Sequence, residues 1–354
     1  MDLNGKRILI LKQSSLGDVI HALPLAHALK RCAPTCHLGW VIEQGLAPLL
    51  DRDASVDSVY PIHIPSTSSP GARWTAYPLA CAAMVRTCQG LHTAFQNAPY
   101  DYVLDLHASF RSGCFGLMNP GGLRVGFADA RELNSLFQHR LVNIPGKVQH
   151  AVEKNILFSQ KIGVPVHDQD FFLTTSDEDA EQAEQFLCDS GGMNAMRFVY
   201  VNPCARWQSK FWFPERWSAL CDRLIEAGIA VVFGGSPNEC AYIERILSRM
   251  RHNGANAAGV LSLTGAVALI KRASVYVGLD TGPMHMAAMA GTPVVALFGP
   301  THPERVGPYN VAHRVIQAQG LDCLCCRKRE CHSPHCMEGI TLDAVYDAVL
   351  QLMV

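Results

Sequence analysis

The sequence has no uninterrupted apolar run of the ~18 residues that a membrane-spanning helix needs. It also lacks an excess of charge of either sign, because 30 Lys and Arg against 31 Asp and Glu give a net charge of −1. A near-neutral chain has no general electrostatic attraction to nucleic acid. The layout of a signal peptide is absent too, since an apolar strand is expected at residues 7–12. We therefore expect a cytoplasmic protein that binds no nucleic acid.

The sequence contains no G-x-G-x-x-G, the loop that holds the pyrophosphate in many dinucleotide-dependent oxidoreductases, which argues against that class. Few residues are charged, 17% against 49% hydrophobic, as in globular rather than disordered proteins. A length of 354 residues suits two domains. Polar residues gather at 167–170 and 174–181, so we place the domain boundary near residue 170.

Short apolar segments alternate with amphipathic ones in both halves of the chain. This alternation predicts two α/β domains, each built on a parallel sheet whose ligands bind at the carboxyl ends of the strands. The strands are expected at residues 7–12, 37–42, 56–60, 100–106, 123–127 and, less clearly, 171–175, and in the second half at 198–203, 229–235, 260–264, 275–279 and 293–299.

The most informative stretch follows the expected strand at 275–279. Asp280 and Thr281 are good helix N-caps, and Gly282 allows a ligand to approach the backbone closely. Unpaired N–H groups and the helix dipole make such a helix start an anion site, which His285 would face from the first turn. Similar strand–turn–helix units also occur without a ligand, and His285 alone could equally be a core residue.

A second strand–loop–helix unit lies near the beginning of the chain. The loop QSSLG at 13–17 precedes Asp18, whose carboxylate is expected at the carboxyl end of a strand. That carboxylate could act as a general base or simply stabilise the start of a helix. Ser14, Ser15 and Gly17 would surround a substrate bound there.

Cations are needed wherever a phosphorylated ligand binds. Lys210 lies among aromatic residues in ARWQSKFW and is our first candidate, with Arg206 a weaker one. Arg73 and Arg131 are further cations in the first half that a phosphorylated ligand could use. Each could equally be a solvated surface residue, as could three further candidates, Arg111, His107 and His150.

Five of the 14 cysteines crowd into a short segment before the expected C-terminal helix. The spacing C-x-x-C-x4-C-x4-C is compatible with a structural Zn or Fe site, and the alternatives are a local disulfide or free thiols. The metal would be structural rather than catalytic, with the ligands Cys323, Cys326, Cys331 and Cys336.

Three stretches together resemble the lipopolysaccharide heptosyltransferases of glycosyltransferase family 9, and in particular their type I branch. They are DTGPMHMAAMAGTPVVALFGPTHP at 280–303, ILILKQSSLGDVIHALPLAHAL at 8–29 and YDYVLDLHASFRSG at 100–113. The resemblance implies a GT-B architecture, with two Rossmann-like domains facing across a cleft. Residues 1–170 would bind the acceptor and 171–340 the nucleotide sugar, while a final helix at 341–354 would pack back on the first domain.

The resemblance also implies the reaction. Heptose would pass with inversion from ADP-heptose to a lipid-linked Kdo acceptor at the inner face of the cytoplasmic membrane, with no cofactor or catalytic metal and with Asp18 as general base. The family often has hydroxyl residues where this chain has Cys204 and Ala205, so those phosphate contacts are missing here. Residues implied in donor binding are Arg206, Lys210, Glu239, Asp280, Thr281, Gly282 and His285, and those in acceptor binding are Ser14, Ser15, Gly17, Arg73 and Arg131.

Two other functions stay open from the sequence. One is a GT-B-like transferase or epimerase that uses a different nucleotide sugar, and the other is a catalytically idle binding protein. Glu239 illustrates the ambiguity, because Ser236-Pro237-Asn238-Glu239 also has the pattern of a helix capping box.

Overall fold

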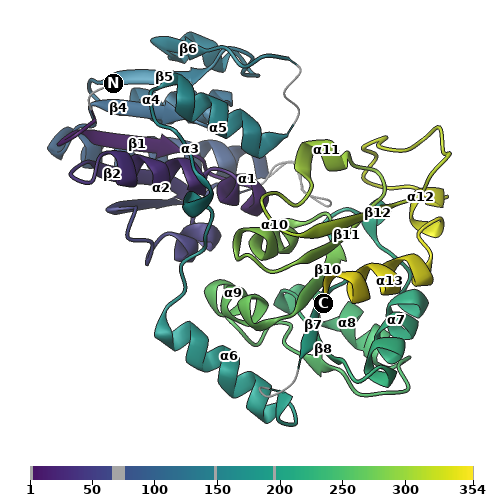
Figure 1. The fold of residues 1–354 in the computed structure, drawn as a ribbon. Coiled ribbons are helices and arrows are strands. Elements are labelled where there is room, and N and C mark those ends of the chain that lie inside the picture. Colours follow the sequence, from purple (N-terminus) through teal and green to yellow (C-terminus); the bar gives the residue numbers. More distant parts are fainter. Residues whose placement is uncertain (1–2, 66–75, 147–149, 194–196, 354) are drawn as a thin grey trace. The chain divides into compact units, whose positions relative to one another are not determined.

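The computed structural model describes residues 3–65, 76–146, 150–193 and 197–353 (Figure 1). The chain divides into two compact units, Met1–Phe171 and Phe172–Val354, one residue after the expected boundary. Among the described residues, none of the helices combines the length and the apolar character that crossing a membrane would take.

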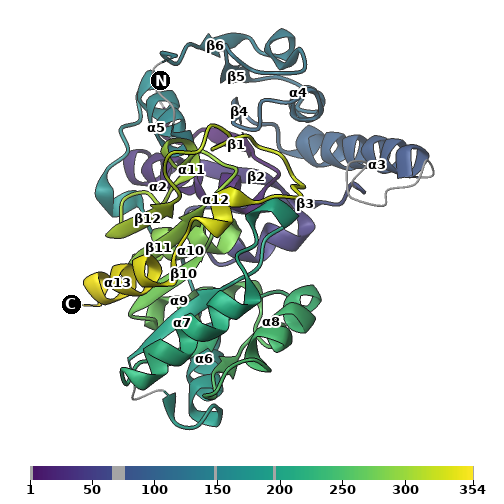
Figure 2. The same ribbon diagram turned by 90° about the vertical axis from the view of Figure 1, so that its right-hand side faces the viewer.

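The first unit is a six-stranded parallel sheet with the order β3-β2-β1-β4-β5-β6. Its helices are α1 (Leu16–Ile20), α2 (Leu23–Cys32), α3 (Ala76–Asn97), α4 (Phe110–Leu117) and α5 (Ala151–Lys161). Within this unit α3 extends well beyond the edge of the sheet (Figure 2). The strands are β1 (Arg7–Leu11), β2 (His37–Glu43), β3 (Ser58–Ile62), β4 (Tyr102–Asp105), β5 (Leu123–Phe127) and β6 (Arg140–Val142).

The second unit repeats this plan with the order β12-β11-β10-β7-β8-β9. The strands are β7 (Phe198–Asn202), β8 (Ala230–Phe233), β9 (Ala255–Asn256), β10 (Val275–Leu279), β11 (Val294–Phe298) and β12 (His313–Gln317). The helices are α6 (Asp177–Asp189), α7 (Pro214–Glu226), α8 (Cys240–Leu247), α9 (Leu263–Arg272), α10 (Gly282–Met289), α11 (Pro303–Val306), α12 (His335–Glu338) and α13 (Leu342–Leu352).

Each sheet has one point where the strand order reverses. In the first unit the chain moves outward from β1 to β3 and then returns to place β4 on the other side of β1. The second unit does the same with β7 and β10. Loops diverge at such a point, so the carboxyl ends of β1 and β4, and of β7 and β10, are where an α/β sheet binds its ligands.

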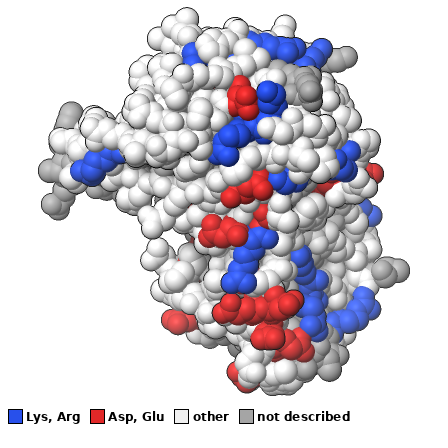
Figure 3. All heavy atoms as spheres, turned by 90° about the vertical axis from the view of Figure 1, so that its left-hand side faces the viewer, with Lys and Arg blue, Asp and Glu red and all other residues white. Residues whose placement is uncertain are grey.

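Charged side chains of both signs are interspersed on the face of the molecule shown in Figure 3, in line with the near-zero net charge. On this face, specific sites would therefore depend on single residues rather than on a broad electrostatic field.

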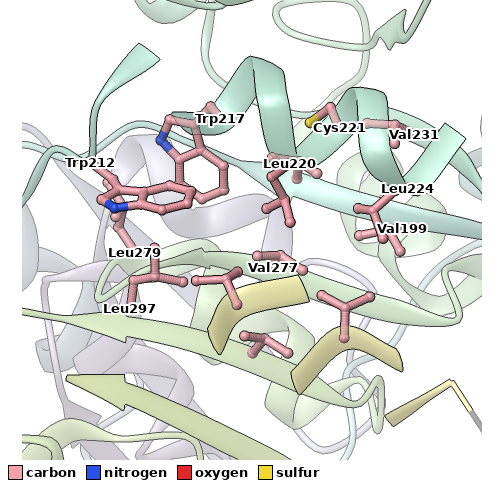
Figure 4. Packing of buried hydrophobic residues seen from close by; sticks show 14 of the residues in the cluster. Val199, Trp212, Trp217, Leu220, Cys221, Leu224, Val231, Val277, Leu279 and Leu297 are labelled. Carbon is pink, nitrogen blue, oxygen red and sulfur yellow. The ribbon is translucent and has the colours of Figure 1, made fainter. Parts of the chain in front are cut away.

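The core of the second unit joins the sheet to α7, α8 and α13. Trp212 and Trp217 meet edge to face, with their ring centroids 5.0 Å apart, above Leu279 and Leu297 of the sheet (Figure 4). The uninterrupted apolar sequences of β10 and β11 fit this position, since both faces of the sheet are covered. The loop that carries Lys210 leads directly to Trp212, and the buried side chain of Trp212 anchors the loop to this core.

In the final helix α13, Val345 and Val349 pack in the core of the second unit, and the expected contact of this helix with the first domain stays a prediction.

Two expected strands are wrong. Residues 260–264 form no strand, and the sheet is extended instead by β9 at Ala255–Asn256. Residues 171–175 are not a strand either, because this segment is the connection between the two units.

Candidate functional site

The loops after β7 and β10 meet at the switch point of the second sheet. Lys210 ends a short 3₁₀ turn, Gln208–Lys210, in the loop after β7. Its Nζ donates to Asp280 Oδ2 at 2.6 Å and to the Asp280 carbonyl oxygen at 2.8 Å, directly after β10. The two side chains are only 14% and 8% exposed, so this is a largely buried ion pair. The pair fixes the lysine at the carboxyl edge of the sheet.

The contacts of Lys210 with Asp280 occupy only part of its hydrogen-bonding capacity. An ammonium group has three N–H donors, and Asp280 takes two of them. The ring of Trp207 lies 4.8 Å from Nζ and favours the cation through its π face. Trp207 was not among the predicted site residues. Its position three residues before Lys210 could have indicated that the ring contacts the ammonium group.

Helix α10 begins at this same point. Thr281 is its N-cap residue, and Pro283 lies in the first turn, as their sequence preferences predict. The Thr281 hydroxyl donates to the carbonyl of Leu279 rather than capping the helix. The start of α10 is thus not closed by the side chain of its own N-cap. His285 is 7% exposed in the first turn.

Glu239 follows β8, the strand next to β7. Its Oε2 accepts hydrogen bonds from the Ser236 backbone N–H at 2.6 Å and the Ser236 hydroxyl at 2.9 Å, so the expected capping box is formed. Both bonds use the same oxygen. Arg206, in the loop of Lys210, is exposed, and the neighbouring Cys204 and Ala205 are a buried and a half-buried small side chain.

In the first unit, Asp18 lies in the first turn of α1 at the β1/β4 switch point. Its Oδ2 accepts from the Ser15 backbone N–H at 3.0 Å and the Ser15 hydroxyl at 2.8 Å. The other oxygen, Oδ1, lies 4.0 Å from Lys12 Nζ, and the side chain is 49% exposed. The helix-stabilising role is therefore present, and it uses only one of the two carboxylate oxygens.

Lys12 determines the charge state of this carboxylate. Partial desolvation by itself would raise the pKa of Asp18, but the charge of Lys12 and the hydrogen bonds from Ser15 outweigh it, so the pKa lies below its ordinary value. Lys12 is 12% exposed, and its Nζ donates to the carbonyl of Leu106 at 2.9 Å. Our prediction overlooked Lys12. It directly follows β1, six residues before Asp18, and this position could have indicated that the two side chains meet.

His107 borders the same carboxylate from the loop after β4. Burial and the charge of Lys12 lower the pKa of His107 to about 4, so the ring is neutral near pH 7. Among the described residues no group pairs with its buried Nδ1. The loop is fixed by Asp105, whose carboxylate accepts from the backbone N–H groups of His107 and Ala108 and from Asn134 at 2.7 Å.

The other predicted acceptor residues divide into three groups. Ser14 and Ser15 lie in the loop before α1, and Gly17 is buried within the helix. Arg131 is exposed beyond β5, and Arg73 lies outside the described residues. His150 has a structural role, since its Nδ1 accepts from the Val152 N–H at the start of α5. Roles in binding for Ser14, Ser15, Gly17 and Arg131 stay predictions.

The cysteine segment does not bring together the four ligands of the metal site that its spacing would allow. Among the described residues, which include all of 323–336, no group of three or more His, Cys, Asp or Glu side chains could hold a metal ion. Cys336 is buried in the core of the second unit, and Cys323 and Cys326 are exposed. Cys325, which was not among the four ligands, donates to the Thr301 carbonyl at 3.3 Å.

Comparisons with known proteins match nearly the whole chain. The family model of glycosyltransferase family 9 (heptosyltransferase) matches residues 89–337. Lipopolysaccharide heptosyltransferase 1 of Pseudomonas aeruginosa is 30% identical over 336 residues, which cover 92% of this chain and 87% of that protein.

Solved structures agree in fold. A glycosyl transferase family 9 protein from Veillonella parvula superposes with a TM-score of 0.83 at 22% identity, covering 100% of this chain and 98% of the other. The E. coli heptosyltransferase WaaC, solved with ADP-2-deoxy-2-fluoro heptose, gives a TM-score of 0.69 at 25% identity and covers 98% and 99%. The two parallel-sheet units thus have the Rossmann-like domains of the GT-B architecture that the sequence predicts.

Proposed function

The chain belongs to glycosyltransferase family 9, the heptosyltransferases, and on that basis we propose that it transfers heptose from ADP-heptose to the Kdo region of the lipopolysaccharide inner core. The observation that carries the proposal is the Lys210–Asp280 pair beside the start of α10, at the switch point of the second sheet. A cation beside the backbone N–H groups of a helix start suits a diphosphate. The similar WaaC enzyme was solved with an ADP-sugar, which supports ADP-heptose as donor.

We assign the donor to the second unit. The third N–H of Lys210 would bind the diphosphate and stabilise the negative charge that grows on it as the bond to the sugar breaks. Backbone groups at Thr281 and Gly282, with His285 and Arg206, would complete the phosphate contacts. Glu239 would accept a ribose hydroxyl through Oε1, since Ser236 occupies Oε2. Asp280 would hold Lys210 in place rather than touch the phosphates.

We assign the acceptor to the first unit, with Asp18 as general base. The acceptor hydroxyl oxygen would attack the anomeric carbon of heptose from the face opposite the phosphate. The bond between that carbon and the phosphate oxygen breaks, ADP leaves with the electron pair, and Asp18 Oδ1 takes the hydroxyl proton. This direct displacement inverts the anomeric configuration and needs no catalytic metal. Ser14, Ser15, Gly17, Arg73 and Arg131 would bind the acceptor, a lipid-linked molecule at the inner face of the cytoplasmic membrane.

Two measurements test this function. Purified protein should form an inverted heptoside from ADP-heptose and Kdo-lipid A. In a thermal-shift series, ADP, UDP, GDP and NAD are compared at one common concentration, about 100 times the Kd for ADP, and ADP alone should raise Tm by about 5 °C. Selective stabilisation by UDP or GDP would instead favour a transferase or epimerase for another nucleotide sugar. If none of the four nucleotides stabilises the protein, a binding protein without transferase activity becomes the better explanation.

Lys12 offers a separate test through pH. Its charge lowers the pKa of Asp18, so Asp18 stays ionised to lower pH than an ordinary aspartate. Replacing Lys12 with Met removes that charge, and the pKa of Asp18 should rise. The acid limb of the kcat/KM profile should then move to higher pH, while the alkaline limb stays in place. An unchanged acid limb would contradict the assignment of Asp18 as the titrating base.

A further inference from the structure

The solvent-facing side of helix α3 is mainly apolar in its first half and mainly polar in its second half. Its first half, residues 76–86, exposes apolar side chains, with Leu79 59% and Val85 57% exposed. Its second half exposes polar side chains on the corresponding side. The exposed residues include Tyr77, Pro78, Leu79, Cys81, Ala82, Val85 and Arg86 in the first half and Gln89, Gly90, His92, Thr93, Gln96 and Asn97 in the second.

The inner side of the same helix explains how it is held. Leu91 and Phe95, in the second half, are 5% and 0% exposed in the core of the first unit. In the first half Ala83 is buried and Met84 only partly so. The helix is therefore anchored by one end, and its other end extends beyond the sheet (Figure 2). A helix of this kind in water normally keeps its outer side polar along its whole length.

The chain around this apolar end contains basic residues but no acidic ones. Between Asp57 and Asp101 the sequence contains no Asp or Glu, and Arg86 is exposed where the apolar part of the outer side ends. In Figure 3 the projecting part of the first unit shows uncharged and basic atoms, and no acidic ones, where it is drawn in colour. An apolar surface with a cation at its rim matches a bilayer whose headgroups are anionic, because arginine can reach the phosphates while its neighbours enter the apolar layer.

We propose that residues 76–86 of α3 dock on a lipid bilayer with anionic headgroups. This inference rests on the proposed function, since an enzyme whose acceptor is a lipid must work at a membrane surface. Eleven helical residues span only about 16 Å, so this segment enters one leaflet and does not cross the bilayer. Leu79 and Val85 enter the apolar layer, and Arg86 stays at the headgroups.

Vesicle binding tests the proposal without any assay of catalysis. The full chain is sedimented with vesicles of phosphatidylethanolamine and phosphatidylglycerol, and with vesicles of phosphatidylcholine alone. We expect binding to the anionic vesicles that weakens with added salt. The double variant Leu79→Gln/Val85→Gln should bind about tenfold more weakly, and Arg86→Gln should lose most of the preference for anionic vesicles.

The matched control is Val260→Gln, since Val260 is 61% exposed in the second unit and should leave vesicle binding unchanged. The proposal is overturned if wild type does not bind, if the double variant binds as wild type does, or if that variant changes the oligomeric state in place of vesicle binding. Transfer to a deacylated, water-soluble acceptor separates this proposal from the function itself. The double variant should keep that transfer, whereas failure of wild type to transfer to any acceptor would contradict only the proposed function.

Discussion

Replacing Asp18 with Asn should lower kcat by about 10²–10⁴-fold and leave ADP binding unchanged. Asn keeps an oxygen that can accept the two hydrogen bonds from Ser15, so the start of α1 stays intact. What disappears is the ionised oxygen near Lys12, to which the proposal assigns the proton. Steady-state transfer assays measure the loss, and calorimetric titration with ADP measures the binding that should persist.

The chain contains a control for the structural part of this effect. Asp179 accepts from the backbone N–H and the hydroxyl of Ser176 at 3.0 and 2.7 Å, which is nearly the geometry of Ser15 and Asp18. Asp179→Asn should therefore change transfer by less than about twofold. If Asp18→Asn and Asp179→Asn had equally small effects, Asp18 would only stabilise its helix, and the proton would go elsewhere.

Replacing Lys210 with Ala should lower kcat by about 10²–10³-fold and also weaken ADP binding. The diphosphate loses its nearest cation in both the bound state and the transition state, and more in the latter because charge is still growing there. The substitution also leaves Asp280, 8% exposed, without its partner, which costs about 3–5 kcal/mol of stability. Transfer assays, ADP titration and thermal melting should each register part of this change.

Two further variants separate charge from stability. The double variant Lys210→Ala/Asp280→Asn removes the unpaired carboxylate, so Tm should recover while transfer stays low. Lys30 and Asp57 form a pair of the same length, 2.6 Å, in the first unit, with Lys30 22% exposed. Lys30→Ala should lower Tm slightly and leave kcat unchanged. Recovery of transfer in the double variant would mean that Lys210 acts only through folding.

The central strands and the edge strand β3 were predictable, but the other three edge strands were not. β1, β10 and β11 are short apolar runs between helices, and a buried parallel strand needs no other signal. β6 and β12 were missed because edge strands are partly exposed and read as loops, with Arg140 and His313 both exposed. The amphipathic character of the final helix predicts that it packs on a core, but not on which domain.

Site residues next to strand ends were easier to predict than their partners. Asp18, Lys210 and Asp280 all follow strands, and the rule for α/β sheets selects such positions. The Lys210–Asp280 pair joins residues far apart in the sequence, so only the order of strands β7 and β10 brings them together. This pairing also gives a reason for a carboxylate beside the proposed phosphate site, which sequence alone left unexplained.

That pairing has a consequence for the resting enzyme. Because Asp280 already serves as counter-ion to Lys210, the ammonium offers little net attraction to small free anions. Inorganic phosphate, which cannot use the nucleotide and sugar contacts, would compete poorly for a lysine that is already paired with a carboxylate. Only a ligand that supplies the further contacts of a whole sugar nucleotide would gain enough to occupy it.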